Sequence, residues 1–597
     1  MAVQAQAPIQ TQPQPQTITV TATRTPVRVS DVVAEVTVLD RAAIQRSEGR
    51  TLVEILSQQP GLQFSSTGGL GKTSGLFIRG LEARHTLLLV DGVRVFSATV
   101  GTPSLDNLPL EMVDRIEIVR GPLSSLYGSG AFGGVIQVFT RRGGPGLSGS
   151  AKASAGSNGY GQLAAGVGFG DGRFDGAVRV QHTRVDGFSA TNAQVPFGSH
   201  HPDDDGFRQN AGSVRLGWQL TPGWRVDATV LQSTGKSAID DGPSAGAQAE
   251  VHNRVGMVSL GGSVAPGWRM RLFASDATDS YDTLSSASAF AALGAIRSRQ
   301  RQYGWENSLD TPLGALVLLA ERLEERVSRP GQPFQISKRH VDAAAAGLSG
   351  AAGPHLWQAS LRRDRNSQFG NQDNGAVAYA FALTPAWRVG ASLGASYVAP
   401  SFNQLYFPNF GNPLLVPEEG EHGELSLRWT AGEHNLRAAW YEHRYRGFIT
   451  SGPQPVNLPK ARIDGLTLSY ETRWRNLQLN ASLDHTDPRN ATVGNPNHDK
   501  LLPRRAQRAA RLGADWDGGG WSAGATAAAF SQRFDDAANT VRLAGYATLD
   551  LRADWRIDRQ WTLGARLNNV GDKAYHTALG YNQPGREAFV TLRWTSR

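Results

Sequence analysis

The sequence of 597 residues contains no cysteine. Disulfide scaffolds, thiolate metal sites and cysteine nucleophiles are therefore excluded. Charged residues make up 19% of the chain, below the roughly 25% that is usual in soluble domains, whereas glycine, with 68 residues, is well above average. No run of about 18 or more apolar residues occurs, so a membrane-spanning helix is excluded. This composition rules out a helical transporter and is unusual for a cytosolic enzyme.

Blocks of basic residues are also missing. The chain carries 60 Lys and Arg against 52 Asp and Glu, a formal net charge of +8, and the basic residues are spread along its whole length. Neither a zinc-finger spacing nor an aromatic RNA-binding motif accompanies them. We therefore expect no nucleic-acid partner, and anionic membrane headgroups are the better counterpart for the positive charge.

Residues 1–28 predict a flexible tail, because a segment rich in Gln, Pro and Thr buries too little apolar surface to offset the entropy lost on ordering. The tail lacks the charged and apolar regions of a secretory signal. The chain is therefore expected to be either cytosolic or a mature form without its signal. Within the tail, residues 17–24 (TITVTATR) alternate and favour a strand, which prolines isolate on both sides.

Residues 29–145 predict a compact α+β domain. Short helices are expected over 41–48 and 51–59, the second beginning at the Thr51 cap and ending at a Pro-Gly pair. Buried or half-buried strands are expected at 86–90, 115–120 and 135–140.

After about residue 146 the helical period gives way to alternation. Val214, Leu216, Trp218 and Leu220 alternate with polar residues and glycine, and a similar series begins at Trp224 after a short turn. This pattern predicts an antiparallel hairpin with one apolar and one polar face. Pro266-Gly267-Trp268 and Pro385-Ala386-Trp387 repeat the pairing of a short turn with Trp, which is typical of a membrane interface.

Long polar, glycine-rich stretches separate these short turns, at 183–210, 232–252, 398–424, 485–505 and 571–587. Short turns at one end and long loops at the other are typical of a transmembrane β-barrel. About 450 residues, with strands and connections of ~10 residues each, give about 22 strands. We therefore predict a 22-stranded antiparallel transmembrane β-barrel over residues 146–597, with a lumen that must be plugged. The stretches 315–327 and 341–352 favour helices by propensity but are predicted as barrel strands.

Two motifs resemble nucleotide-binding loops. The GxGxxG spacing at 128–133 precedes a strand, opens no helix and is followed by no acidic residue at the required distance, so tight turn packing explains it better. Gly71-Lys72-Thr73 resembles the end of a phosphate loop, but Ser66 occupies the position of its first glycine. No arrangement typical of a catalytic site stands out, so an enzyme is not expected.

Carboxylates gather in two of the predicted loops, at Asp203-Asp204-Asp205 and at Asp240-Asp241. Closely spaced carboxylates repel one another unless a cation lies nearby. The local pattern fits either a cation site or two exposed turns. The histidines show no paired metal spacing.

Six ordered motifs of the first domain carry a family resemblance, at 52–61, 77–80, 89–93, 113–117, 120–122 and 126–136. Together they resemble the plug domain of TonB-dependent outer-membrane transporters. Within residues 17–24, the segment Thr17, Ile18, Thr19, Val20, Thr21 and Ala22 then resembles the TonB box. The resemblance implies a monomer among lipid and lipopolysaccharide of a Gram-negative outer membrane. It also implies a partner protein, TonB, which acts with ExbB and ExbD and drives import by pulling on the box.

Within that family, the likeness is closest to the cobalamin (vitamin B12) transporters, on the motifs at 366–370, 397–400, 404–406, 411–413, 568–575 and 580–587. It implies cobalamin contacts from Thr73, Gly75, Glu82, Val100 and Gly101 on the plug and from Arg533 on a barrel loop. It also implies a calcium site at Asp203, Asp205 and Asp240. A ferric siderophore or haem receptor of the same fold, and a passive porin or adhesin barrel, are the alternatives.

Overall fold

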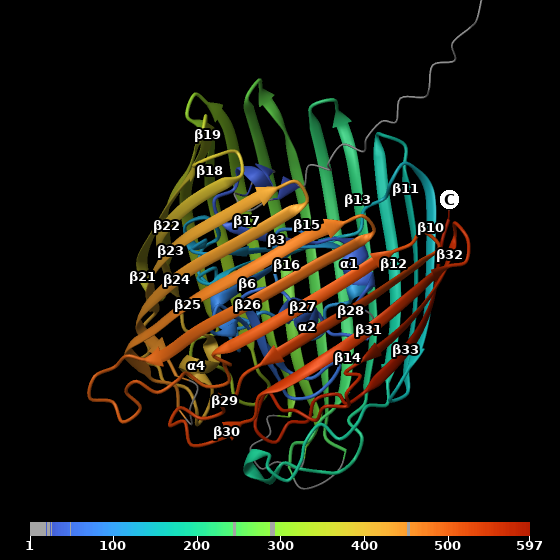
Figure 1. Cartoon of the computed structure of the whole chain (residues 1–597). Coiled ribbons are helices and arrows are strands. Elements are labelled where there is room, and N and C mark those ends of the chain that lie inside the picture. Colours follow the sequence, from blue (N-terminus) through green and yellow to red (C-terminus); the bar gives the residue numbers. More distant parts are fainter. Residues whose placement is uncertain are drawn as a thin grey trace, which may run out of the picture.

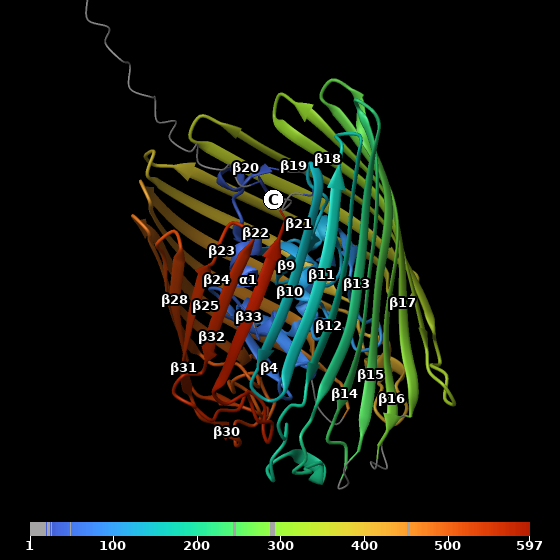
Figure 2. The same ribbon diagram turned by 90° about the vertical axis from the view of Figure 1, so that its right-hand side faces the viewer.

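The computed structural model describes residues 19–20, 24, 27–47, 49–242, 246–286, 293–450 and 454–596. Twenty-two strands form a closed barrel, and the N-terminal elements lie inside it, as the blue ribbons in two perpendicular views show (Figures 1 and 2). Within the described ranges, no helix is long and apolar enough to cross a membrane. The predicted fold class is confirmed.

All neighbouring wall strands are antiparallel, and β10 pairs with β33 to close the barrel, from Ser150 opposite Thr595 to Gly156 opposite Phe589. A closed sheet has no free edge that could pair with another chain. The wall strands are β10 (Gly146–Gly156), β11 (Tyr160–Gly170), β12 (Phe174–Val185), β13 (Phe207–Thr221), β14 (Trp224–Ala238), β15 (Gln248–Ala265), β16 (Trp268–Ser285), β17 (Gly294–Thr311), β18 (Gly314–Ser328), β19 (Lys338–Ala352), β20 (His355–Asn366), β21 (Gly370–Ala382), β22 (Trp387–Val398), β23 (Glu418–Ala431), β24 (His434–Ile449), β25 (Asn457–Trp474), β26 (Leu477–Asn490), β27 (Arg508–Asp517), β28 (Trp521–Phe530), β31 (Tyr546–Arg556), β32 (Trp561–Asn568) and β33 (Glu587–Thr595).

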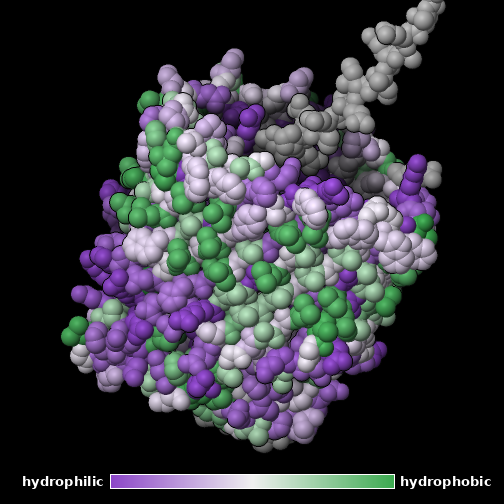
Figure 3. All heavy atoms as spheres, viewed as in Figure 1, coloured by the Kyte–Doolittle hydropathy of each residue, from purple (hydrophilic) through white to green (hydrophobic). Residues whose placement is uncertain are grey.

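Alternation along each strand separates an apolar exterior from a polar lumen. On β13, Val214 and Leu216 are exposed on the outside, whereas Arg215 between them is buried in the lumen. Figure 3 shows apolar side chains over the middle of the wall and hydrophilic ones gathered over its lower end. The predicted hairpin of β13 and β14 is confirmed, and its turn is Pro222-Gly223.

The two ends of the barrel differ, and we call them the turn end and the loop end. Short connections close the turn end, and long ones lie at the loop end, at the bottom of Figure 1. The loops carry η4 (Pro196–Gly198), α4 (Phe402–Tyr406), β29 (Arg533–Phe534) and β30 (Arg542–Leu543). The predicted loop 232–252 is mostly strand, because β14 and β15 continue through it. Polar side chains such as Ser233 and Ser237 face the lumen there and do not interrupt a wall strand.

Strands β18 and β19 cover the two stretches that favour helices by propensity, so their prediction as strands is confirmed. Each pairs with wall strands on both sides over most of its length. Because this pairing satisfies the backbone of the whole segment, tertiary context overrides local propensity.

The N-terminal elements form a five-stranded sheet in the order β3-β8-β9-β6-β7, in which only β6 and β9 are parallel. The elements are η1 (Val29–Asp31), β3 (Glu35–Leu39), α1 (Arg41–Gln45), α2 (Leu52–Ser57), β4 (Leu62–Ser66), β5 (Ser74–Ile78), η2 (Ala83–His85), β6 (Thr86–Val90), β7 (Val93–Arg94), η3 (Leu110–Met112), β8 (Val113–Arg120), α3 (Ser124–Tyr127) and β9 (Gly134–Thr140). Thr51 caps α2 through a capping box with Glu54, as predicted, although α1 and α2 are shorter than expected.

An aromatic ring of the inner domain packs against the wall at a glycine. Phe132 stacks on Tyr445 at a ring-centroid distance of 4.5 Å and lies over Gly420 of β23. A Cβ atom at Gly420 would come within 1.8 Å of the Phe132 ring. Close packing of the two domains therefore depends on this glycine.

We expect Gly420→Val to displace Phe132 and to cost about 1–3 kcal/mol, the usual penalty of overpacking. The displaced inner domain would leave a water-filled path, measured as a rise in ion conductance of the protein in a planar bilayer. Gly423→Val is the matched control, because Gly423 lies on the same strand and its nearest neighbour is the Leu393 side chain at 3.6 Å. Equal conductance of the two variants would contradict this account of the packing.

Candidate functional site

Buried charge pairs tie the inner domain to the wall. Arg79 donates to Glu424 of β23 at 2.6 Å and to Glu35 of β3 at 2.9 Å. Glu418, also on β23, accepts from Arg84 at 2.9 Å and lies 2.8 Å from His85 Nε2. These contacts are between side chains, so the inner domain is held without joining the sheet of the wall.

Wall and loop arginines also donate to backbone carbonyls of the inner domain. Arg505 reaches Gly80 O at 2.6 Å, and Arg511 reaches Ser57 O at 2.8 Å. Arg533, a predicted ligand contact, donates to Phe64 O at 3.2 Å. Only 1% of Arg533 is exposed, so its guanidinium positions β4 rather than facing the solvent.

The predicted ligand contacts on the inner domain differ in accessibility. Thr73 is exposed, and Val100 is 56% exposed. Gly75 lies within β5, opposite Ser65. Gly101 is buried, and a Cβ atom added to it would lie only 2.8 Å from the Cβ of Ser401, which is too close. The structure therefore offers two of these five positions, Thr73 and Val100, to a molecule arriving from the loop end.

Glu82, the remaining predicted contact, pairs with Arg505 and lies 3.7 Å from Arg84. Burial favours its neutral form, but the two arginines outweigh burial and lower the pKa of Glu82 to about 2. A charged Glu82 therefore anchors its loop to the barrel loop that carries Arg505.

Asp106 is a polar residue of this region that the sequence did not single out as a contact. Burial raises the pKa of Asp106 to about 7, and the Ser74 hydroxyl donates to its carboxylate. The neighbouring Ser104 donates to Asp279 of β16 at 2.6 Å. The only sequence signal for Asp106 is its place shortly after the predicted contacts Val100 and Gly101.

The predicted calcium ligands each have a partner of their own. Asp203 contacts His201 Nδ1 at 2.8 Å, and Asp240 accepts from the Thr191 hydroxyl. Asp205 accepts from the backbone N–H of Ala190 at 2.8 Å. In the part of the chain that the structure describes, no three His, Asp or Glu side chains gather as a metal site. Calcium binding by these aspartates stays a prediction.

A lysine of the inner domain lies beside these carboxylates. The Nζ of Lys72 is 3.9 Å from Asp205, and only 5% of its side chain is exposed. Burial lowers the pKa of Lys72 to about 8, although Asp205, Asp240 and Asp203 oppose that shift. Burial likewise raises the pKa of Asp205 to about 6, against the effect of Lys72.

At the turn end, the segment that resembles a TonB box is partly described. Thr19 and Val20 form β1 (Thr19–Val20), which pairs with β2 (Val27–Arg28). Val20 is fully buried in an apolar cluster with residues of β6 and α3. Thr17, Ile18, Thr21 and Ala22 lie outside the described residues.

Arg24 fastens this segment to the wall. Its guanidinium donates to Glu306 of β17 at 2.7 Å and lies 3.4 Å from Glu321 of β18. It also donates to Leu126 O at 2.8 Å and lies over the ring of Tyr127. The segment is therefore held in the lumen by charge pairs with the wall as well as by apolar burial.

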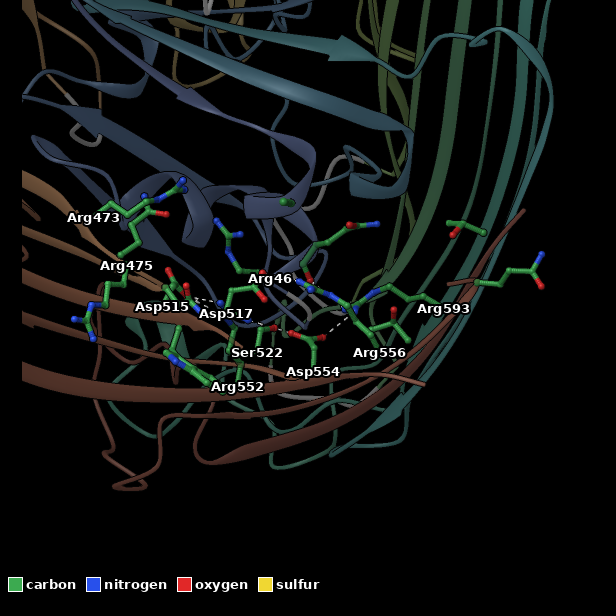
Figure 4. A pocket seen from close by; sticks show the side chains of 18 residues that line it. Arg46, Arg473, Arg475, Asp515, Asp517, Ser522, Arg552, Asp554, Arg556 and Arg593 are labelled. Atoms are coloured by element: carbon green, nitrogen blue, oxygen red, sulfur yellow. Dashed lines mark hydrogen bonds and ion pairs between the residues drawn. The ribbon is translucent and has the colours of Figure 1, made fainter. Parts of the chain in front are cut away.

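Two polar cavities open in the lumen toward the turn end. One, of about 300 Å³, is lined by Arg24 and Glu306. The other, of about 560 Å³, lies between α1 and the wall, where Arg593 pairs with Asp554 at 3.0 Å (Figure 4). The inner domain therefore leaves space for water at the turn end of the barrel.

Comparison with known families identifies both domains. The TonB-dependent receptor plug domain matches residues 28–135, and the TonB-dependent receptor-like β-barrel matches residues 232–570. The chain belongs to the TonB-dependent receptor family. The inner domain is its plug, and the family consists of receptors and transporters of the outer membrane rather than enzymes.

Relatives of this TonB-dependent receptor include the vitamin B12 transporter BtuB of Photobacterium profundum, 28% identical over 583 residues, and that of Vibrio vulnificus, 28% identical over 596. Both alignments cover 95% of this chain and 93% of the relative. A variant of the ferric enterobactin receptor PfeA of Pseudomonas aeruginosa has a TM-score of 0.80 at 19% identity, and the siderophore receptor PirA of Acinetobacter baumannii 0.81 at 16%. Both structural matches cover 94% of this chain and 98% of the other, and they show the fold alone.

We expect Arg24→Ala to free the N-terminal segment of the receptor, because removing one partner of a buried ion pair costs about 3–5 kcal/mol. Limited proteolysis of the purified receptor should cut within residues 17–26 faster in the variant. Arg28→Ala is the matched control, because Arg28 is exposed four residues further on. Cleavage of Arg24→Ala at the rate of the unaltered receptor would show that Arg24 does not hold the segment.

Proposed function

We propose that this receptor imports cobalamin across the outer membrane of a Gram-negative bacterium, with TonB supplying the work. The similarity to two vitamin B12 transporters carries this proposal, because it extends over 95% of the chain and thus over plug and barrel together. A likeness confined to the plug would indicate the family without indicating the ligand. The same proposal places the loop end outside the cell and the turn end in the periplasm.

The exposed plug positions suit a large ligand fringed with amides. Thr73 offers a hydroxyl, and Val100 offers apolar surface beside the tight turn at Gly101. Shape complementarity with many modest hydrogen bonds is how such ligands are held. Glu82 and Arg533 would act behind this surface, by fixing the loops that present it.

Coupling would begin at Thr19–Val20. A short strand on a tail is suited to pairing with the edge of a partner's sheet. We propose that TonB, driven by ExbB and ExbD, binds the box in this way. Because Val20 is buried and Arg24 is paired, the box must leave these contacts before a partner strand can pair with it. Force on the box would then act first on the plug segment fastened by Arg24.

A ferric siderophore is the second candidate ligand. The observation in its favour is the fold similarity to the receptors PfeA and PirA. At 16–19% identity this similarity shows the fold alone.

We expect purified receptor in detergent to bind cyanocobalamin saturably at micromolar ligand, measured by isothermal titration calorimetry. Val100→Glu should weaken binding at least about tenfold, since it puts a charge on an apolar contact, and tenfold corresponds to about 1.4 kcal/mol. Val493→Glu is the control, because Val493 is 85% exposed on another loop. Saturable binding of ferric enterobactin without cyanocobalamin binding would reassign the ligand.

A further inference from the structure

Lys72 is a buried cation at the tip of the plug, and its bonds reach beyond the plug. Its Nζ donates to Ser237 Oγ at 2.8 Å and to the carbonyl of Ala238, at the outer end of β14. Asp205 Oδ1, on the loop between β12 and β13, lies 3.9 Å away. One plug side chain thus reaches both the end of a wall strand and a connection at the loop end.

The backbone around Lys72 is shaped to admit this side chain. Gly68 has φ of +143°, and a Cβ there would lie 2.8 Å from Lys72 Cγ and 3.1 Å from the Cβ of Ala190. Gly71 has φ of +74°, and a Cβ there would lie within 2.1 Å of the Phe207 ring. Both glycines let the plug loop approach the barrel loop closely enough to bury the ammonium.

The carboxylates around this ammonium do not form a cage for a divalent ion. Calcium takes six to eight oxygen ligands, at about 2.3–2.6 Å. Asp203 faces His201, Asp240 accepts from Thr191, and Asp205 accepts from a backbone N–H. The cation that lies beside these carboxylates in this structure is the Lys72 ammonium, 3.9 Å from Asp205.

We propose that Lys72 is the resident cation of the acidic outer loops, which orders them without a divalent metal and joins them to the plug. Its ammonium neutralises carboxylates from two connections that would otherwise repel each other. Because Lys72 belongs to the plug, withdrawal of the plug loop removes this charge from the outer loops. The outer loops would then loosen whenever the plug is remodelled. The inference does not depend on which ligand is carried.

Hydrogen exchange of residues 188–206, followed by mass spectrometry on the full-length receptor, tests this proposal. In the unaltered receptor, exchange should be the same, within about twofold, in EGTA and in about 10 mM calcium chloride, a concentration that would fill even weak extracellular calcium sites. Slowing of exchange by at least about tenfold on adding calcium would overturn the proposal. This arm needs no substitution.

Lys72→Met should speed exchange of the same residues at least about tenfold, because it removes the cation that lies 3.9 Å from the buried carboxylate of Asp205. Lys72→Arg should keep exchange near that of the unaltered receptor, and Lys72→Met with Asp205→Asn should recover part of the protection. Lys236→Met is the matched control, because Lys236 is exposed on the same stretch of β14. Exchange of Lys72→Met at the unaltered rate would overturn the proposal.

Discussion

A wide lumen must be sealed by a domain that can later be moved, and this constraint governs the rest of the structure. The wall is a closed ladder of 22 strands, so opening it would break a continuous row of backbone hydrogen bonds. The plug adds no strand to that wall, and buried side-chain pairs such as Arg79–Glu424 and Arg84–Glu418 hold it there. Such contacts can be exchanged for water one at a time, whereas the wall strands depend on one another.

The same arrangement recurs at both ends of the plug. At the turn end, Arg24 of the N-terminal segment pairs with wall carboxylates. At the loop end, Lys72 of the plug tip lies among loop carboxylates. In both places the plug supplies the cation and the barrel supplies the acid. Movement of the plug would therefore take a cation away from carboxylates of the barrel at both ends.

The sequence predicted the wall well, because alternation is a local signal that repeats along each strand. The hairpin at Pro222-Gly223 and the Thr51 cap follow from residues a few positions apart, and both are confirmed. The loop between β14 and β15 was predicted too long, because lumen-facing polar residues resemble loop residues in a single sequence.

The contacts of the candidate site are harder to predict from the sequence than the wall, because they join residues that are far apart in the chain. Whether Arg533 faces solvent or the Phe64 carbonyl depends on a contact between residues 469 positions apart. The partners of Arg24 and Lys72 are likewise distant in sequence, and no local pattern identifies them. The only local pattern that includes Lys72 is Gly71-Lys72-Thr73, which resembles the end of a phosphate loop. Long-range pairing between plug and barrel is the information that one sequence does not reveal.

Pulling on the N-terminus of the receptor in a supported bilayer tests the central claim most directly. The chain has no cysteine, so Ala2→Cys provides a single attachment point for force spectroscopy. We predict that the plug yields first, with a gain in length of at most about 400 Å, the extended length of residues 27–140 at roughly 3.5 Å each. The barrel should remain closed during that step. Peeling of wall strands before any lengthening of the plug would contradict the account.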